Sequence, residues 1–132
     1  MSATITLTDQ DKSIVRVAAY GAVSLLAAAG ASHKGVTQGS IALTSATGLV
    51  GHVLAAKSKD IELKGKNTAE LAEQVLPAVT AAMCLLNDQD PAEAANFRAT
   101  VLVAVEAAAR SGKPSPAVTA MARKIGEALD AA

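Results

Sequence analysis

Alanine contributes 31 of the 132 residues of this chain, whereas aromatic residues contribute 2%. Alanine lets helices approach one another closely, but each alanine buries little apolar area. The core must therefore come from leucine, valine and isoleucine at helical spacing. We predict an all-α protein, a single-domain helical bundle of five helices over residues 1–132, or of six helices if Pro77 splits the third.

The length and charge of the chain limit its partners. A chain of 132 residues fits one domain and is too short for two independent cores. Twelve basic residues balance twelve acidic ones, so the chain lacks the positive field of a nucleic-acid-binding protein. The single cysteine, Cys84, lies in an apolar run, which predicts a buried structural thiol in a reducing compartment.

The N-terminal region bears on location. Residues 1–8 have no cationic start and precede two aspartates, so they do not resemble a secretory signal. The most apolar stretch, residues 17–31, holds about 15 residues, whereas a membrane span needs roughly 20. The sequence predicts a cytoplasmic protein and favours a helix buried in protein over a membrane span.

The first half of the chain predicts an extended arm, a long helix and a loop. Residues 1–8 form the arm, and Thr8 is suited to cap a helix over residues 9–29. The polar residues of that helix form one narrow stripe: Lys12, Arg16, Tyr20 and Ser24. A helix with so little polar surface is expected to be central. Three glycines then predict a loop over residues 30–39.

A second helix is predicted over residues 40–57, with one apolar face and one small, mostly uncharged face. The small face consists of Ser40, Thr44, Thr47, Gly48 and Gly51. Small side chains permit close approach of another helix, from this chain or from another copy. This face is therefore a candidate interface, and a solvated threonine surface is the alternative.

A charged connector over residues 57–66 leads to a third helix. Asn67 is suited to cap that helix, and its apolar residues repeat at helical spacing from Leu71 to Leu86. Pro77 interrupts the pattern. Because proline removes a backbone donor and clashes with the preceding turn, we expect a kink or two short helices there.

The last third predicts a helical hairpin over residues 90–130. Asp90 and Pro91 give one helix a capping aspartate and a proline in its first turn. Ser115 and Pro116 begin the final helix in the same way. The short connector between them implies that the two helices are antiparallel.

This C-terminal segment carries a resemblance. Residues 90–129 read DPAEAANFRATVLVAVEAAARSGKPSPAVTAMARKIGEAL. They resemble the C-terminal helical hairpin of a group of uncharacterised, alanine-rich bacterial helical proteins, in which Asp-Pro-Ala-Glu precedes Phe-Arg or Phe-Lys and a valine-leucine helix. The connector here, residues 111–115, is shorter than in that group. The resemblance covers less than a third of the chain and implies no activity.

No cluster of reactive side chains stands out. His33, His52 and Cys84 occur at no spacing that places two metal ligands on one helical face. No serine lies in the strand–turn–helix setting of a nucleophile elbow. Residues 30–35 have the glycine spacing of a phosphate-binding loop but lack its lysine. We predict no catalytic residue, no metal and no cofactor.

These patterns favour a non-enzymatic protein-interaction module, most simply one that associates with itself as a homo-oligomer. The interface would lie on the helix over residues 9–29 or on the small face. Residues 68–97 carry five acidic and no basic residues. This charge could form a solvated acidic face, and the alternative is that it orients a protein partner. Nucleic acid and membrane are disfavoured as partners.

Two alternatives from other classes stay open. One is a small-molecule-binding protein or an unusual enzyme, with a pocket between the first two helices. The residues that would line this pocket are Tyr20, His52 and Cys84. The other alternative is a membrane-associated helical protein.

Overall fold

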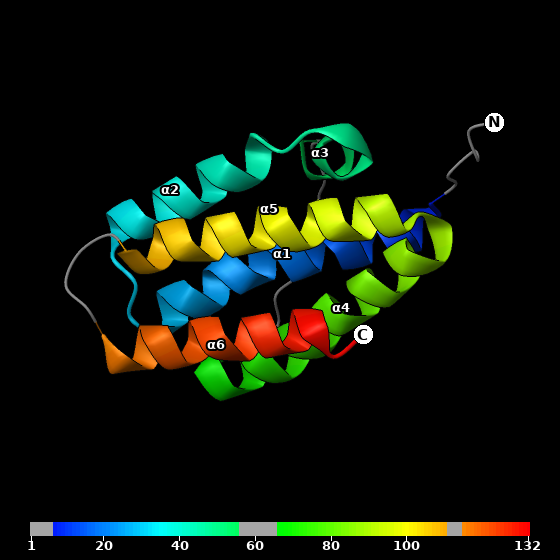
Figure 1. Ribbon diagram of the computed structural model, residues 1–132. Helices are drawn as coiled ribbons and strands as arrows, with labels where there is room; N and C mark the ends of the chain where they lie inside the picture. The colour runs from blue at the N-terminus through cyan, green and yellow to red at the C-terminus, as the bar shows by residue number, and fades with distance from the viewer. Residues whose placement is uncertain (1–6, 56–65, 111–114) are drawn as a thin grey trace.

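A computed structural model describes residues 7–55, 66–110 and 115–132 of the chain. These residues form six helices and no strand (Figure 1). The helices are α1 (Asp9–Ala29), α2 (His33–Thr44), α3 (Gly48–Ala55), α4 (Thr68–Gln89), α5 (Pro91–Arg110) and α6 (Pro116–Asp130). The prediction of an all-α, single-domain bundle is confirmed. Most of the expected arm, residues 1–6, lies outside the described residues.

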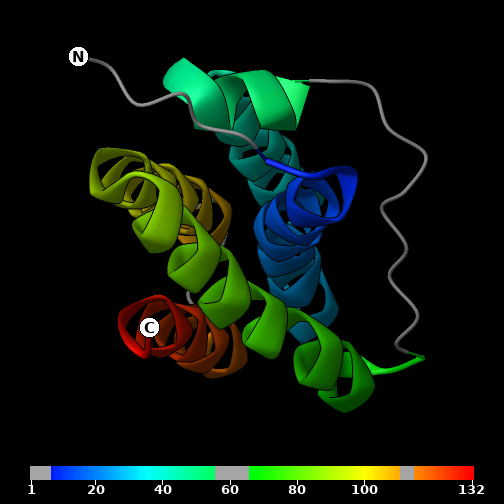
Figure 2. The same ribbon diagram turned by 90° about the vertical axis from the view of Figure 1, so that its right-hand side faces the viewer.

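Helix α1 is the central element, as its narrow polar stripe predicts. It packs against each of the other five helices, and nine of its residues are buried. Its start is fixed by a capping box, in which the Thr8 hydroxyl accepts from the Asp11 amide at 3.0 Å and the Asp11 carboxylate accepts from the Thr8 amide at 3.2 Å. Helix α4 runs obliquely across α1, α5 and α6 (Figure 2).

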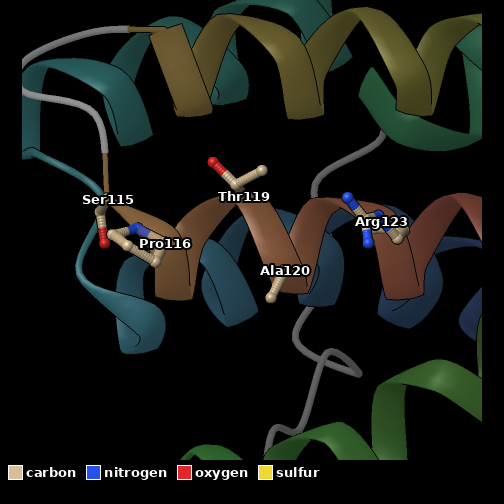
Figure 3. A pocket seen from close by; sticks show the side chains of 5 residues that line it. All are labelled: Ser115, Pro116, Thr119, Ala120 and Arg123. Atoms are coloured by element: carbon tan, nitrogen blue, oxygen red, sulfur yellow. The ribbon is translucent and has the colours of Figure 1, made fainter.

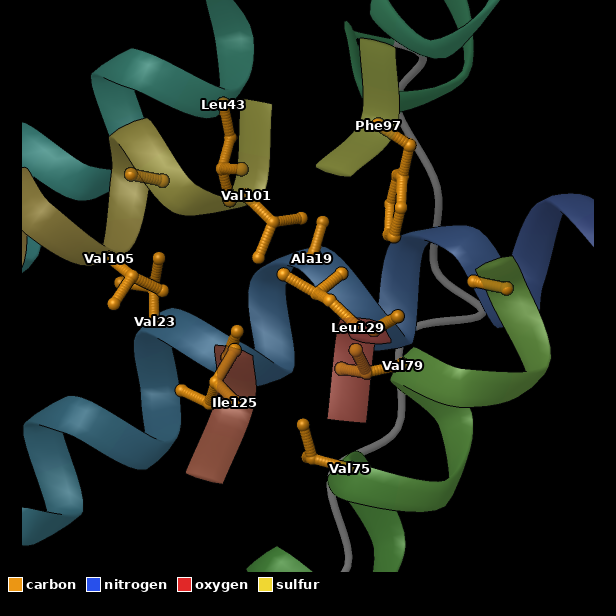
Figure 4. Packing of buried hydrophobic residues seen from close by; sticks show 14 of the residues in the cluster. Ala19, Val23, Leu43, Val75, Val79, Phe97, Val101, Val105, Ile125 and Leu129 are labelled. Atoms are coloured by element: carbon orange, nitrogen blue, oxygen red, sulfur yellow. The ribbon is translucent and has the colours of Figure 1, made fainter. Parts of the chain in front are cut away.

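The core is made of short aliphatic side chains around one aromatic ring. Phe97 is fully buried, together with leucines, valines and one isoleucine from all six helices. Figure 4 labels ten of the core residues: Ala19, Val23, Leu43, Val75, Val79, Phe97, Val101, Val105, Ile125 and Leu129. Because alanines lie between these larger residues, the helices approach closely and the core stays thin.

The two C-terminal helices run antiparallel and contact each other (Figure 1). The capping residues act as predicted: the Asp90 carboxylate accepts from the Ala92 amide at 3.0 Å, and the Ser115 hydroxyl accepts from the Val118 amide at 3.4 Å. Arg98 of α5 donates to Asp130 of α6 at 2.9 Å. This hydrogen bond, with the charge of the carboxylate, raises the pKa of the Arg98 guanidinium. The connector over residues 111–114 lies outside the described residues.

Pro77 does not split the third predicted helix. Asn67 caps α4 as expected, and the helix continues from Thr68 to Gln89 with Pro77 inside it. Pro77 and Glu73, whose carbonyl loses its helical partner to the proline, are both exposed, so water can serve that carbonyl. The opposite side of α4 is held in the core, where Val75 and Val79 are fully buried.

The prediction of a loop over residues 30–39 is wrong. Ser32 caps α2 by accepting from the Gly35 amide at 3.0 Å, so the helix begins at His33. Gly39 is buried where α2 meets α5, and a Cβ atom there would lie 3.0 Å from the Ala104 carbonyl oxygen. The glycine therefore serves close helix packing, although its position in the sequence suggests a turn.

The prediction of one helix over residues 40–57 is also wrong. The helix is broken at residues 45–47, and the chain restarts as α3 at Gly48, whose φ of +72° is left-handed. The total of six described helices therefore arises from this break and not from Pro77. The connector over residues 57–66 falls outside the described residues except for Lys66.

Candidate functional site

The short helix α3 is held at its start by two side chains of α5. The Glu93 carboxylate accepts from the Val50 amide at 3.1 Å, and the Asn96 amide group donates to the Thr47 carbonyl at 2.8 Å. The first amides of a helix have no partner within it, and its N-terminus favours negative charge. Glu93 supplies both an acceptor and that charge.

The end of α3 is held by two side chains of α1. Arg16, 8% exposed, donates from Nε to the Val53 carbonyl at 3.1 Å, and the Tyr20 hydroxyl donates to the Leu54 carbonyl at 2.6 Å. The last carbonyls of a helix lack partners within it and favour a cation. Burial raises the pKa of Tyr20, and the Arg16 charge partly offsets this.

Two of these four side chains belong to the polar stripe of α1, and the other two were missed from the sequence. Arg16 and Tyr20, one turn apart in the stripe, bond to consecutive carbonyls of α3. From the sequence, Glu93 is predicted to add to the acidic charge of residues 68–97, and no role is predicted for Asn96. Their spacing of three residues, which places two polar groups on one side of α5, was the available signal.

The structure does not bring together the three residues proposed to line a pocket. Tyr20 is half-buried and bonded to α3, His52 is exposed on α3, and Cys84 is exposed on α4. Helices α3 and α4 do not contact each other. The expectation of a buried thiol at Cys84 is wrong, because the apolar run around it belongs to a helix whose outer side faces solvent.

The small residues proposed as an interface do not share one helical face. Ser40 and Thr44 lie on α2, Thr47 lies in the break, and Gly48 and Gly51 lie on α3. A Cβ atom at Gly51 would overlap the Ala46 carbonyl of the same chain, so this glycine serves packing within the molecule.

The outer face of α2 remains available to a partner. We define it as the exposed residues Thr37, Ile41, Thr44 and Ser45. No Asp, Glu, Lys or Arg occurs between Lys34 and Lys57. The three hydroxyls of this face donate to carbonyls of their own helix, at 3.0 Å from Thr37, 3.0 Å from Thr44 and 2.8 Å from Ser45. The face therefore demands few hydrogen bonds from solvent.

Two large aliphatic side chains are strongly exposed in the described part of the chain, and both lie on one helix pair. Ile41 of α2 is 51% exposed, and Val103 of α5 is 57% exposed. Helices α2 and α5 pack directly against each other. Each of these exposed aliphatic groups lies on one of two contacting helices, where a partner could cover it.

A depression of about 550 Å³ lies along the start of α6 (Figure 3). Its lining consists of Ser115, Pro116, Thr119, Ala120 and Arg123. The Ser115 hydroxyl is engaged as the helix cap, and Arg123 is exposed to water. The described residues of this lining include no acid paired with a base and no nucleophile beside a general base.

Helices α1 and α4 are long and apolar enough to cross a membrane by length and composition. Half of the apolar window of α1 is buried in the bundle, and a third of that of α4. Core helices of soluble proteins meet the same criterion, and α1 is the central helix of this bundle. Among the described residues, no group of three His, Cys, Asp or Glu side chains is placed to hold a metal ion.

Comparison of the chain with family models, curated proteins and solved structures finds no match. The resemblance over residues 90–129 stays a prediction. Function is therefore argued from the surfaces described above.

Proposed function

We propose that this protein is a non-enzymatic interaction module that associates with a second copy of itself through the outer face of α2 and the adjoining surface of α5. The observation that supports this proposal is the shared location of Ile41 and Val103 on two contacting helices. Burial of exposed aliphatic groups against another copy would add apolar contact that the thin core lacks.

The polar groups of the outer face of α2 also favour association. A buried hydroxyl is costly when its hydrogen bond is left unmade. Here the Thr37, Thr44 and Ser45 hydroxyls already donate within their own helix, so covering them costs little. A two-fold symmetric contact would bring the same uncharged face of each copy together, with no like charges opposed along its length.

Two other surfaces are less suited to this role. Helix α1, considered as an interface from its sequence, uses its apolar residues in contacts with the other five helices. The small residues from Ser40 to Gly51 are divided between two helices, and among them only Thr44 belongs to the outer face of α2. A cytoplasmic location remains the prediction from sequence.

The test is sedimentation of the protein from about 1 µM to about 1 mM, a range that covers weak to moderate association. We expect the mass to rise toward that of a dimer. Ile41→Asp should keep the protein monomeric, because two carboxylates would oppose each other in an apolar contact. The matched control Ala81→Asp, on the exposed side of α4, should associate as the unmodified protein does. A mass that stays monomeric throughout contradicts the proposal.

Membrane association is a second candidate, favoured by the apolar helix α4, two thirds of whose apolar window is not buried. Flotation with vesicles of neutral and anionic phospholipid separates the two candidates. Recovery of the protein with vesicles, together with a monomeric mass in their absence, would favour the membrane. Recovery in the aqueous fraction, together with a dimeric mass, favours self-association.

A further inference from the structure

Helix α3 depends on its neighbours to exist. It has eight residues, whereas isolated helices shorter than about 12 residues are marginal in water. A non-helical break at residues 45–47 separates it from α2, and the left-handed φ of Gly48 marks its start. These features make α3 a distinct unit with a hinge on its N-terminal side.

Among the described helices, α3 contacts only those in one part of the bundle. Helix α3 packs against α1, α2 and α5, and not against α4 or α6. It buries Val50, Val53 and Leu54 against this part of the core. The long contacts among α1, α4, α5 and α6 do not involve α3, so they can persist without it.

The polar contacts of α3 are concentrated at its two ends. Glu93 and Asn96 bond to its first turn and to the break before it, while Arg16 and Tyr20 bond to its last turn. Each end meets the charge that complements the helix dipole, a carboxylate at the start and a guanidinium at the end. Release of either end leaves backbone groups without partners and favours release of the whole short helix.

We infer that α3 undocks from the bundle as one unit while α1, α4, α5 and α6 stay folded. Arg16 and Glu93 hold it in the docked state by their hydrogen bonds to its two ends. Undocking exposes Val50, Val53 and Leu54 and the surfaces of α1 and α5 that they cover. It gives the molecule a second, locally opened state without loss of the fold. This inference does not depend on the proposed self-association.

The test is hydrogen exchange of the full chain at a dilution where it is monomeric, read by mass spectrometry or NMR. We expect the amides of residues 51–55 to exchange faster than those of α4 and α5, through an opening that depends less on denaturant than global unfolding does. Arg16→Met keeps the apolar stem and removes the donor. It should speed exchange in α3 about tenfold to a hundredfold and leave α4 and α5 unchanged.

A matched control removes another arginine hydrogen bond. Arg98→Met, which breaks the contact with Asp130 between α5 and α6, should leave exchange in α3 unchanged. If Arg16→Met does not fold, Tyr20→Phe removes one hydroxyl, keeps the ring, and should speed exchange in α3 severalfold. Equal exchange of α3 and the core helices in the unmodified protein, with one common response to denaturant, would overturn the inference.

Discussion

Helices α2 and α4 both expose an uncharged stretch to solvent. The two stretches differ in the size of their largest aliphatic side chain and in the charge of the residues that flank them. The exposed middle of α4 consists of Pro77, Ala81 and Cys84, with Glu73 and Asp88 at its ends. The outer face of α2 instead centres on Ile41, and its hydroxyls bond inward. We therefore expect association through the uncharged face that offers a large aliphatic group and lacks an acidic border.

The inner sides of the two helices differ as well. Helix α4 faces the core with leucine, valine and methionine, whereas α2 does so with Gly35, Gly39 and Leu43. The first kind of contact gains area from large side chains. The second gains close approach of backbones. The protein should therefore lose stability when a core side chain of α4 is shortened, and when a core side chain of α2 is enlarged.

The largest effect is expected where α4 loses volume. Leu86 is fully buried, so Leu86→Ala should lower the free energy of unfolding by about 2–5 kcal/mol, since it removes apolar contact and leaves a cavity. Urea denaturation followed by circular dichroism measures the change. A loss under about 1 kcal/mol would mean that α4 contributes little to the core.

A smaller effect is expected where α2 gains volume. Gly39→Ala would bring a Cβ atom to 3.0 Å from the Ala104 carbonyl oxygen and to 3.3 Å from Val23. We expect a loss of about 1–3 kcal/mol, even though alanine is the better helix former. The matched control is Gly126→Ala in α6, where nothing lies within 4 Å of the added atom and a small gain in stability is expected. Equal gains at both sites would show that α2 does not rest tightly on α5.

The smallest effect on stability is expected from changes at the two outer faces. Ile41→Asp and Ala81→Asp replace exposed residues and should each change the free energy of unfolding of the monomer by about 0.5 kcal/mol or less. Denaturation in dilute solution checks this. A large loss from Ile41→Asp alone would mean that Ile41 supports its own bundle, and its effect on association would then have another cause.

Much of the fold follows from local sequence signals. Thr8, Asn67, Asp90 and Ser115 mark the starts of α1, α4, α5 and α6, because caps depend only on residues within one turn. The region of α2 and α3 was predicted wrongly for the opposite reason. Whether a glycine such as Gly39 breaks a helix or lets two helices approach depends on a neighbour distant in the sequence.

In the candidate site, too, the local signals could be predicted from the sequence and the contacts between distant residues could not. Arg16 and Tyr20 were recognised as a polar stripe, but their acceptors on α3 lie 37 and 34 residues away in the sequence. Periodicity can indicate that a side chain is set apart from an apolar face, and it does not identify the partner. The exposure of Ile41 could not be predicted in the same way, because it depends on which side of α2 packs against α1 and α5.

The most direct test of the difference between α2 and α4 is thiol labelling at increasing protein concentration. Native Cys84 reports on the exposed side of α4, and Thr37→Cys combined with Cys84→Ser reports on the outer face of α2. We predict that labelling at position 37 slows about tenfold as the protein associates, while labelling of Cys84 keeps its rate. Protection of Cys84 with free labelling at position 37 would contradict the assignment of the interface to α2.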